Sequence, residues 1–553
     1  MKKLLLVFFL GVGISGCADL VRQPLTPVDV KILAINDFHG NLKAPEEGIT
    51  IVDPNDKTKK IQVPAGGSER MATLVNELRA KNANNIFVAA GDLIGASPIL
   101  SSLFHHEPTV ESLSLMDLEV TSVGNHEFDR GKDELIRLQT GGCHPKDGCK
   151  GPRPFKGARF QYLAASTINT ESGKTIFPAF YVKKFDGIPV AFIGLTLKGT
   201  PNVVAPSGVK GLEFKDEADT VNAVVVELKK QNIEAFVVLI HEGGFPTGDY
   251  NECPGISGPI VDIVKKFDKA IDLVISGHTH KAYNCVIDGR LVTSGDKYGT
   301  IVSEIDVKLE RKTGDVIYAK ANNLIVRADT YAEDPAQTKL IAEYEALSAS
   351  LAGRVVGFIT ASFPQTENSA GESMVGDLIA DAHLMATRAE KDGGAVIAFM
   401  NPGGIRTGIV KRPDGKVTYG DIFTPQPFSN SLVTLTLTGE QIKKLLEQQW
   451  LDQPKPRFLQ ISRGFTYTWD AARPTGTRVL SHTIKLNGRP IDMKAAYRVT
   501  ANEFLAGGGD GFSVMKEGKD RHFGIFDLQA LEAYIQANSP LTPSERDRIR
   551  REN

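Results

Sequence analysis

Five short apolar segments in the N-terminal half of the chain each end in side chains that can bind a metal ion. The clearest, residues 118–123, leads directly into Gly-Asn-His-Glu-Phe-Asp at residues 124–129. Short runs rich in β-branched residues are typical of strands that are covered on both faces. Ligands of such α/β sheets bind beyond the carboxyl ends of the strands. The sequence therefore predicts a layered α/β domain with a site along one edge.

The other four segments repeat this arrangement. Residues 30–35 precede Asn-Asp-Phe-His-Gly, residues 86–90 precede Gly-Asp, residues 235–240 precede His, and residues 271–276 precede Gly-His-Thr-His. A single residue of this kind could be a helix cap or a core histidine. Five strands that each end in such a residue instead indicate one metal site. Its candidate ligands are Asp37, His39, Asp92, Asn125, His241, His278 and His280.

Taken in order, Asp-x-His, Gly-Asp, Gly-Asn-His-Glu, His and Gly-His-x-His resemble the calcineurin-like metallophosphoesterases. The forms Asn-Asp-Phe-His-Gly and Gly-Asn-His-Glu-Phe-Asp resemble the bacterial 5′-nucleotidase branch of that family. The resemblance implies two divalent ions, one held by Asp37, His39 and His280 and the other by Asn125, His241 and His278, with Asp92 bridging. Oxygen and imidazole ligands admit Mn, Zn, Co or Fe.

The same resemblance assigns a catalytic pair next to the metal ligands. His126 would face the phosphoryl group, and Asp129 would orient its other ring nitrogen. An imidazolium can stabilise the negative charge of a transition state, and its partner fixes the tautomer.

The C-terminal part carries a different chemistry, with glycine-rich loops and two aromatic residues suited to a flat ligand. Taken singly, the glycines could form ordinary turns and the phenylalanines could belong to a core. Together they resemble the substrate-binding C-terminal domain of bacterial 5′-nucleotidases. That resemblance implies that Phe428 and Phe504 sandwich the base and that Asp510 binds the ribose. Arg406 and Asn430, with the loop that begins at Asn401, would help to hold the nucleotide.

One position departs from the family's pattern. The family's Asn-Gly-Gly-Gly-Ile-Arg is Asn-Pro-Gly-Gly-Ile-Arg here, at residues 401–406. Pro402 removes a backbone donor, so no ligand contact is expected from that nitrogen.

Residues 1–16 have the features of a lipoprotein signal peptide: a basic start, an apolar stretch too short to span a bilayer, and Ile-Ser-Gly before Cys17. We expect Cys17 to be lipidated and residues 17–27 to form a tether. Ala18, in place of an aspartate, favours an outer-membrane lipoprotein that faces the periplasm or the cell surface. The alternative is an ordinary secretory signal with an incidental cysteine.

The four remaining cysteines are consistent with an oxidising compartment. They permit three pairings, of which we favour Cys143–Cys149 and Cys253–Cys285. A zinc site built from them would lack the usual C-x₂-C spacing.

At 553 residues the chain is too long for one hydrophobic core. We expect a metallophosphoesterase domain at 28–330, a helical linker at 331–352 and a smaller α/β substrate-binding domain at 353–553. The net charge of −2 gives no indication of a nucleic-acid polymer as partner, and a monomer is expected.

These features together predict an exported, lipid-anchored, dinuclear hydrolase that removes phosphate from nucleoside 5′-monophosphates. The alternatives on the same scaffold are 2′,3′-cyclic nucleotide phosphodiesterase activity and hydrolysis of UDP-sugars or of the NAD pyrophosphate. A thiosulfohydrolase-like enzyme is disfavoured by the phenylalanine pair. A non-catalytic surface-binding lipoprotein is disfavoured because a residue able to bind metal stands at every one of the ligand positions.

Overall fold

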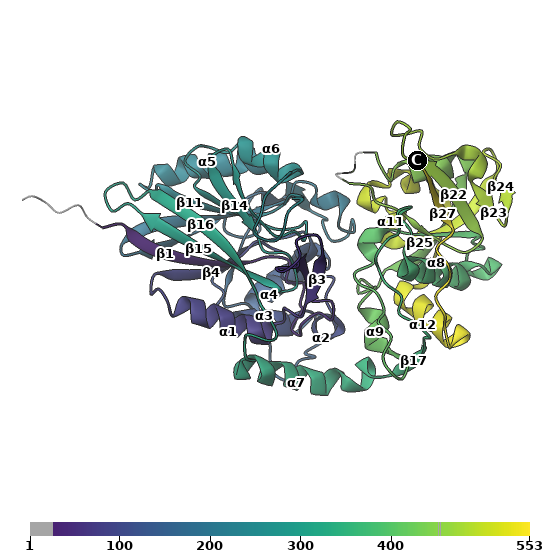
Figure 1. Ribbon diagram of the computed structural model, residues 1–553, viewed down its shortest axis with the longest axis horizontal. Coiled ribbons are helices and arrows are strands. Elements are labelled where there is room, and N and C mark those ends of the chain that lie inside the picture. Colours follow the sequence, from purple (N-terminus) through teal and green to yellow (C-terminus); the bar gives the residue numbers. More distant parts are fainter. Residues whose placement is uncertain (1–25, 452, 454) are drawn as a thin grey trace, which may run out of the picture.

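The computed structural model describes residues 26–451, 453 and 455–553. They form two α/β lobes joined by α7 (Pro335–Ala352), which runs along the first lobe and leads into the second (Figure 1). Asp334 caps this helix, and Pro335 occupies its first turn. The predicted signal peptide and Cys17 lie outside the described residues. In the described part of the chain, no helix is long and apolar enough to cross a bilayer.

The first lobe contains two six-stranded sheets. The first sheet has the order β16-β15-β1-β4-β5-β6, with β1 parallel to β4, β4 to β5 and β5 to β6. Its strands are β1 (Val28–Ile35), β4 (Asn85–Ala89), β5 (Val120–Ser122), β6 (Gln161–Leu163), β15 (Ile301–Leu309) and β16 (Val316–Ile325). The second sheet has the order β13-β14-β12-β11-β9-β8, with a parallel centre. Its strands are β8 (Phe180–Phe185), β9 (Ile188–Thr196), β11 (Ala235–His241), β12 (Leu273–Ser276), β13 (Tyr283–Ile287) and β14 (Arg290–Ser294).

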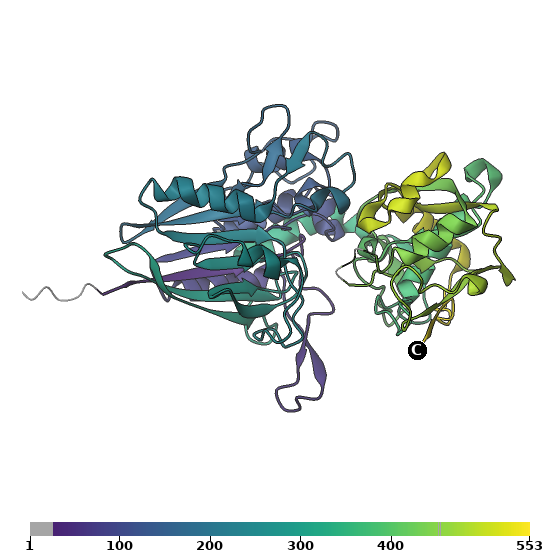
Figure 2. The same ribbon diagram turned by 90° about the horizontal axis from the view of Figure 1, so that it is seen from above.

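The sheets pack face to face, and helices cover their outer faces (Figure 2). Along β1, Ile32 and Ala34 belong to the core between the sheets, whereas Leu33 and Ile35 pack under the helices. This alternation explains the continuous apolar runs in the sequence, because both faces of β1, β4, β5, β11 and β12 are buried. The first sheet is covered by α1 (Ser68–Arg79), α3 (Glu107–Leu115) and α4 (Lys132–Thr140), and the second by α5 (Glu217–Lys229) and α6 (Pro259–Lys265). The predicted layered sandwich is confirmed.

The second, smaller lobe is also α/β, as predicted. A five-stranded sheet, β21-β18-β25-β20-β26, lies beside a four-stranded one, β24-β23-β22-β27. Their strands are β18 (Ile397–Met400), β20 (Ser431–Thr438), β21 (Gln460–Ile461), β22 (Phe465–Asp470), β23 (Lys485–Leu486), β24 (Arg489–Pro490), β25 (Ala496–Asn502), β26 (Lys519–Phe526) and β27 (Ile549–Glu552). The main helices are α8 (Met374–Thr387), α10 (Gly439–Glu447) and α12 (Asp527–Asn538). Trp450, Phe465 and Trp469 help to fill the core under these sheets.

Shorter elements complete the lobes. They are β2 (Ile49–Val52), β3 (Lys60–Val63), β7 (Thr167–Asn169), β10 (Leu212–Phe214), β17 (Val355–Phe358), β19 (Lys416–Thr418), α2 (Ile99–Ser102), α9 (Tyr419–Phe423) and α11 (Glu503–Ala506). The hairpin of β2 and β3 projects from the first lobe (Figure 2).

Both favoured disulfides are present in the structure. Cys143 and Cys149 close a loop after α4, with their Cα atoms 4.6 Å apart. Cys253, before α6, is joined to Cys285 in β13, with a Cα separation of 5.2 Å. Cys285 is buried in the core under α5 and α6, so this bridge ties a surface loop to the second sheet.

Candidate active site

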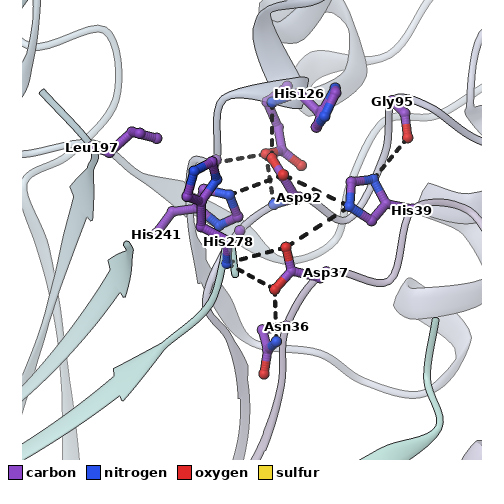
Figure 3. A network of polar contacts seen from close by, with 12 residues as sticks. Asn36, Asp37, His39, Asp92, Gly95, His126, Leu197, His241 and His278 are labelled. Atoms are coloured by element: carbon purple, nitrogen blue, oxygen red, sulfur yellow. Dashed lines mark hydrogen bonds and ion pairs between the residues drawn. The ribbon is translucent and has the colours of Figure 1, made fainter. Parts of the chain in front are cut away.

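The candidate metal ligands come from both sheets of the first lobe. The ends of β1, β4 and β5 supply Asp37, His39, Asp92 and Asn125, and the ends of β11 and β12 supply His241, His278 and His280. The two sheets are stacked with these ends on the same side, so the side chains converge (Figure 3). The structure thus brings together residues as far apart in the sequence as Asp37 and His280.

The donors form two groups, each with its atoms within 4.8 Å of one another: Asp37, His39 and His280 in one, and Asp92, His241 and His278 in the other. Asp92 lies between the groups. Its Oδ2 is 2.9 Å from His241 Nε2 and 3.8 Å from His39 Nε2. A carboxylate in this position can offer an oxygen to each group. Asn125 lines the same cavity as Asp92 and His278.

Backbone carbonyls orient two of the imidazole rings. His39 Nδ1 lies 3.0 Å from the carbonyl oxygen of Gly95, and His241 Nδ1 lies 2.8 Å from that of Ala90. A carbonyl can only accept, so each Nδ1 carries a hydrogen and each Nε2 faces the site. Asp37 is held similarly, because its Oδ2 accepts from the Asn36 side chain at 2.7 Å.

The backbone at the ligands is strained. Five of them have φ between +47° and +69°, a region that residues with a side chain rarely adopt: Asp37, His39, Asp92, His278 and His280. Such conformations cost roughly 1–3 kcal/mol each and cluster at functional sites. The approach is also close at Gly124, where a Cβ atom would lie 2.2 Å from Asp92 Oδ1. Only glycine fits at position 124.

The donor set fits divalent cations. Asn125 Oδ1 is buried and makes no hydrogen bond among the described residues. His241 Nε2 is buried and faces Asp92 Oδ2 at 2.9 Å, and Nε2 of His39 lies 3.0 Å from Nε2 of His280. Burial lowers the pKa of His39 and His280 well below the ordinary value, so their lone pairs are available. Burial also disfavours charge on His241, yet Asp92 and Asp37 raise its pKa to about 10. The site therefore stabilises a positive charge.

The predicted His126–Asp129 pair adjoins these groups. His126 Nδ1 lies 2.8 Å from Asp129 Oδ2, and the His126 backbone N–H donates to Asp92 Oδ1 at 2.8 Å. Burial lowers the pKa of the His126 imidazole, but Asp129 and Asp92 outweigh this effect and raise it above the ordinary value. The ring is also stacked 5.8 Å from that of Phe428 in the second lobe.

A single cavity of about 760 Å³ between the lobes connects the metal groups with the second lobe. From the first lobe it is lined by Asp92, Asn125, His126, Asp129, His278 and His280, whereas Asp37, His39 and His241 lie beneath its surface. From the second lobe it is lined by all six predicted nucleotide-binding residues: Asn401, Arg406, Phe428, Asn430, Phe504 and Asp510.

These six residues differ in their contacts. Asn401 is buried and donates through Nδ2 to Asp510 Oδ2 at 2.7 Å, so it positions that carboxylate. Arg406 Nε makes no hydrogen bond among the described residues, and its charge lowers the pKa of His280 in addition to the effect of burial. Asn430 donates to Asp527 Oδ2 at 3.4 Å. The Phe504 ring packs against Gly509, where a Cβ atom would lie 2.4 Å from it.

Two contributors were not identified from the sequence. Glu127 is buried, and its carboxylate accepts backbone N–H groups of Asp92 at 2.9 Å, Leu93 at 2.8 Å and Gly124 at 2.7 Å. It therefore fixes the loop after β4 against the loop after β5. The sequence signal for Glu127 was its position as the last residue of the Gly-Asn-His-Glu motif. Arg457 Nη1 forms an ion pair with Asp510 Oδ1 at 2.7 Å, and no sequence motif marks it.

Comparison with known proteins identifies related families. The family profile of the calcineurin-like phosphoesterases matches residues 30–282, and that of the 5′-nucleotidase C-terminal domain matches residues 355–517. The chain is 31% identical to the endonuclease YhcR of Bacillus subtilis over 98% of this chain, but it spans only 43% of that protein. It is 30% identical to the cell wall protein Lmo0130 of Listeria monocytogenes, over 93% of this chain and 68% of that protein.

Among solved structures, the 5′-nucleotidase precursor of Thermus thermophilus matches with a TM-score of 0.77 and 26% identity, over 95% of this chain and 99% of that one. The site and the matches together define a calcineurin-like phosphoesterase, a metal-dependent phosphoric ester hydrolase. The chain belongs to the 5′-nucleotidase family.

Proposed function

We propose that this protein hydrolyses nucleoside 5′-monophosphates to nucleosides and phosphate. One observation carries the proposal: the metal-binding groups, the two phenylalanines and the Asp510 carboxylate line the same cavity. In the proposed complex the 5′-phosphate lies at the metal groups, the base lies between Phe428 and Phe504, and the ribose hydroxyls donate to Asp510. The wording "5′-nucleotidase" in the name of the Thermus protein supports this substrate class.

The residues of the chain have separate tasks in this reaction. Arg406 lies at the junction of the metal groups and the second lobe, and its guanidinium suits a phosphate oxygen. The His126 imidazolium, held through Nδ1 by Asp129, presents its other N–H to the cavity. A hydrogen bond from it stabilises the charge that develops on the phosphoryl oxygens. Phe428, next to the His126 ring, places the base so that the phosphate reaches this N–H.

Divalent cations bound to the two groups would supply Lewis-acid polarisation of the phosphoryl group and would lower the pKa of water. We propose that two ions are bound, with Asp37, His39 and His280 holding one, Asn125, His241 and His278 the other, and Asp92 contacting both. Mn, Zn, Co and Fe all suit these donors.

A panel assay tests the proposal. Phosphate release should be measured on AMP, UMP, 2′,3′-cyclic AMP, a UDP-sugar, NAD and p-nitrophenyl phosphate, with added Mn²⁺ and with EDTA. Fast, EDTA-sensitive release from 5′-monophosphates is expected. If the protein hydrolyses p-nitrophenyl phosphate but neither AMP nor UMP, the proposed substrate class is contradicted and the metal site is not. Preference for the cyclic, sugar or NAD substrate would select that alternative.

We further propose that the reaction takes place outside the cytoplasm on a lipid-anchored protein. The lipoprotein-like residues 1–17 and the two disulfides support this location. Cell fractionation with and without a Cys17→Ser substitution tests it. We expect the wild-type protein in the membrane fraction and the Cys17→Ser variant in the soluble fraction. The same distribution of the two proteins between these fractions would contradict the lipid anchor.

A further inference from the structure

Four cationic side chains line the cavity, and none of them contacts the nucleotide directly in the complex proposed above. Lys281 and Lys297 come from the first lobe, and Lys455 and Arg457 from the second. We call these four residues the cationic rim. Among the described residues, no carboxylate forms an ion pair with Lys281 or Lys297. The 5′-phosphate of the substrate would be neutralised at the metal groups. The positive charge of the rim is therefore available to a second anionic group.

The rim extends from the metal groups to the second lobe. Lys297 Nζ lies 4.6 Å from the centre of the Tyr298 ring, and that ring is 5.9 Å from the His280 ring. At the other end, Lys455 Nζ lies 5.5 Å from the centre of the Phe245 ring in the first lobe. The lobes thus bring these cations to opposite sides of one space.

Arg457 places the rim at the proposed ribose site. Its Nη1 donates to Asp510 Oδ1 at 2.7 Å, while Asn401 donates to Asp510 Oδ2. Each carboxylate oxygen of Asp510 therefore accepts one protein donor and can accept a further one from a ligand. The Arg457 backbone is anchored by a hydrogen bond to the Gln449 carbonyl oxygen at 2.9 Å, so its position is built into the lobe.

The nearby acids neutralise only part of the rim. Asp510 offsets the charge of Arg457. Burial raises the pKa of Glu367 to about 7 although Lys455 opposes this, so that carboxyl is partly protonated at neutral pH. Burial and the neighbouring Lys281, Arg457 and Lys297 together lower the pKa of Lys455, as expected for cations that share one space. An added anion would relieve this repulsion.

We propose that the cationic rim binds a second phosphate group on the substrate, carried by the 2′ or 3′ oxygen of the ribose, while the 5′-phosphate occupies the metal groups. The inference rests on the proposed function, because Asp510 marks the ribose edge only if a nucleotide binds as described. A phosphate at that edge cannot donate to Asp510 as a hydroxyl does, but it can accept from the guanidinium of Arg457. Guanidinium groups carry five donors and can serve a carboxylate and a phosphate together.

The test compares kcat/KM for AMP, adenosine 3′,5′-bisphosphate, adenosine 2′,5′-bisphosphate and ADP. The wild type is expected to prefer one bisphosphate to AMP by about tenfold or more. Arg457→Gln should reduce that ratio by about tenfold, the effect of one charge-assisted contact. Lys455→Gln, which does not touch Asp510, should reduce it in the same direction. A bisphosphate that binds without turnover is scored by its inhibition of p-nitrophenyl phosphate hydrolysis.

Arg463→Gln is the matched control, since Arg463 is 72% exposed and does not line the cavity. Its ratio should equal that of the wild type. Equal losses on AMP and on both bisphosphates in the two rim variants would show that the rim only steers anions, and would overturn the inference. A preference for ADP alone would overturn it as well. Absence of AMP hydrolysis with intact p-nitrophenyl phosphate hydrolysis would instead mean that the proposed function has failed.

Discussion

The metal side of the cavity lies within one lobe, on loops that directly follow buried strands, whereas the nucleotide side is built in the other lobe from the loop after β18, the loop before β20 and the segment around α11. On the metal side, five donors have a positive φ, backbone carbonyls orient His39 and His241, and the Glu127 carboxylate holds the backbone of Asp92. On the nucleotide side, Phe428 and Phe504 are partly exposed and line the cavity opposite the metal groups. The difference suggests that chemistry and recognition can be damaged separately.

The largest effect is expected from Asp92→Asn. Asp92 is the donor between the two groups, 2.9 Å from His241 Nε2 and 3.8 Å from His39 Nε2, so its loss weakens both. Turnover of every substrate should fall by more than about 10³, because even one electrostatic group is worth roughly 10²–10³. Metal content by mass spectrometry should fall in parallel. The exposed Asp219 on α5 provides the control, Asp219→Asn, and full metal content in the Asp92 variant would refute the assignment.

His126→Ala should separate catalysis from metal binding. The His126 backbone N–H donates to Asp92, and alanine retains this hydrogen bond. Turnover of AMP and of p-nitrophenyl phosphate should fall together by about 10²–10³, with metal content unchanged. His126 also lies within 4.8 Å of donors on His39 and Asp92. Loss of metal from this variant would therefore make it a ligand.

Phe428→Ala and Phe504→Ala should impair recognition alone. Loss of one stacking partner costs roughly 1–3 kcal/mol per base, which is about tenfold to a hundredfold or more in kcat/KM for AMP. Hydrolysis of p-nitrophenyl phosphate and the melting temperature should change little. Phe358, which is 43% exposed on β17, supplies the control Phe358→Ala. If both rings serve mainly as core, stability and both activities will fall alike.

A smaller effect is expected from Glu127→Gln. The carboxylate accepts four backbone N–H groups, two at each oxygen, and an amide has only one oxygen to accept them. The loops after β4 and β5 should loosen, and metal affinity should fall by about tenfold to a hundredfold, as for other groups that orient ligands. Titration with Mn²⁺ measures this, beside Glu77→Gln on the exposed face of α1. Activity restored at high Mn²⁺ is expected, and unchanged affinity would contradict the role.

The same contrast explains what could be predicted from the sequence. Each metal ligand follows a strand that an apolar run in the sequence predicts, so the ligands could be predicted from their positions after these runs. The sequence does not show that β1, β4 and β5 lie in one sheet and β11 and β12 in another, because periodicity gives no pairing. Arg457 could not be found, because its role depends on a contact to Asp510, 53 residues later, that no local pattern encodes.

The most direct measurement is a crystal structure of the protein with Mn²⁺ and a non-hydrolysable phosphonate analogue of AMP, with anomalous scattering recorded. The account predicts two anomalous peaks, one among Asp37, His39 and His280 and the other among Asn125, His241 and His278. It also predicts the base between Phe428 and Phe504 and the phosphonate at the metal groups. A single peak, or a base bound away from the two phenylalanines, would contradict it.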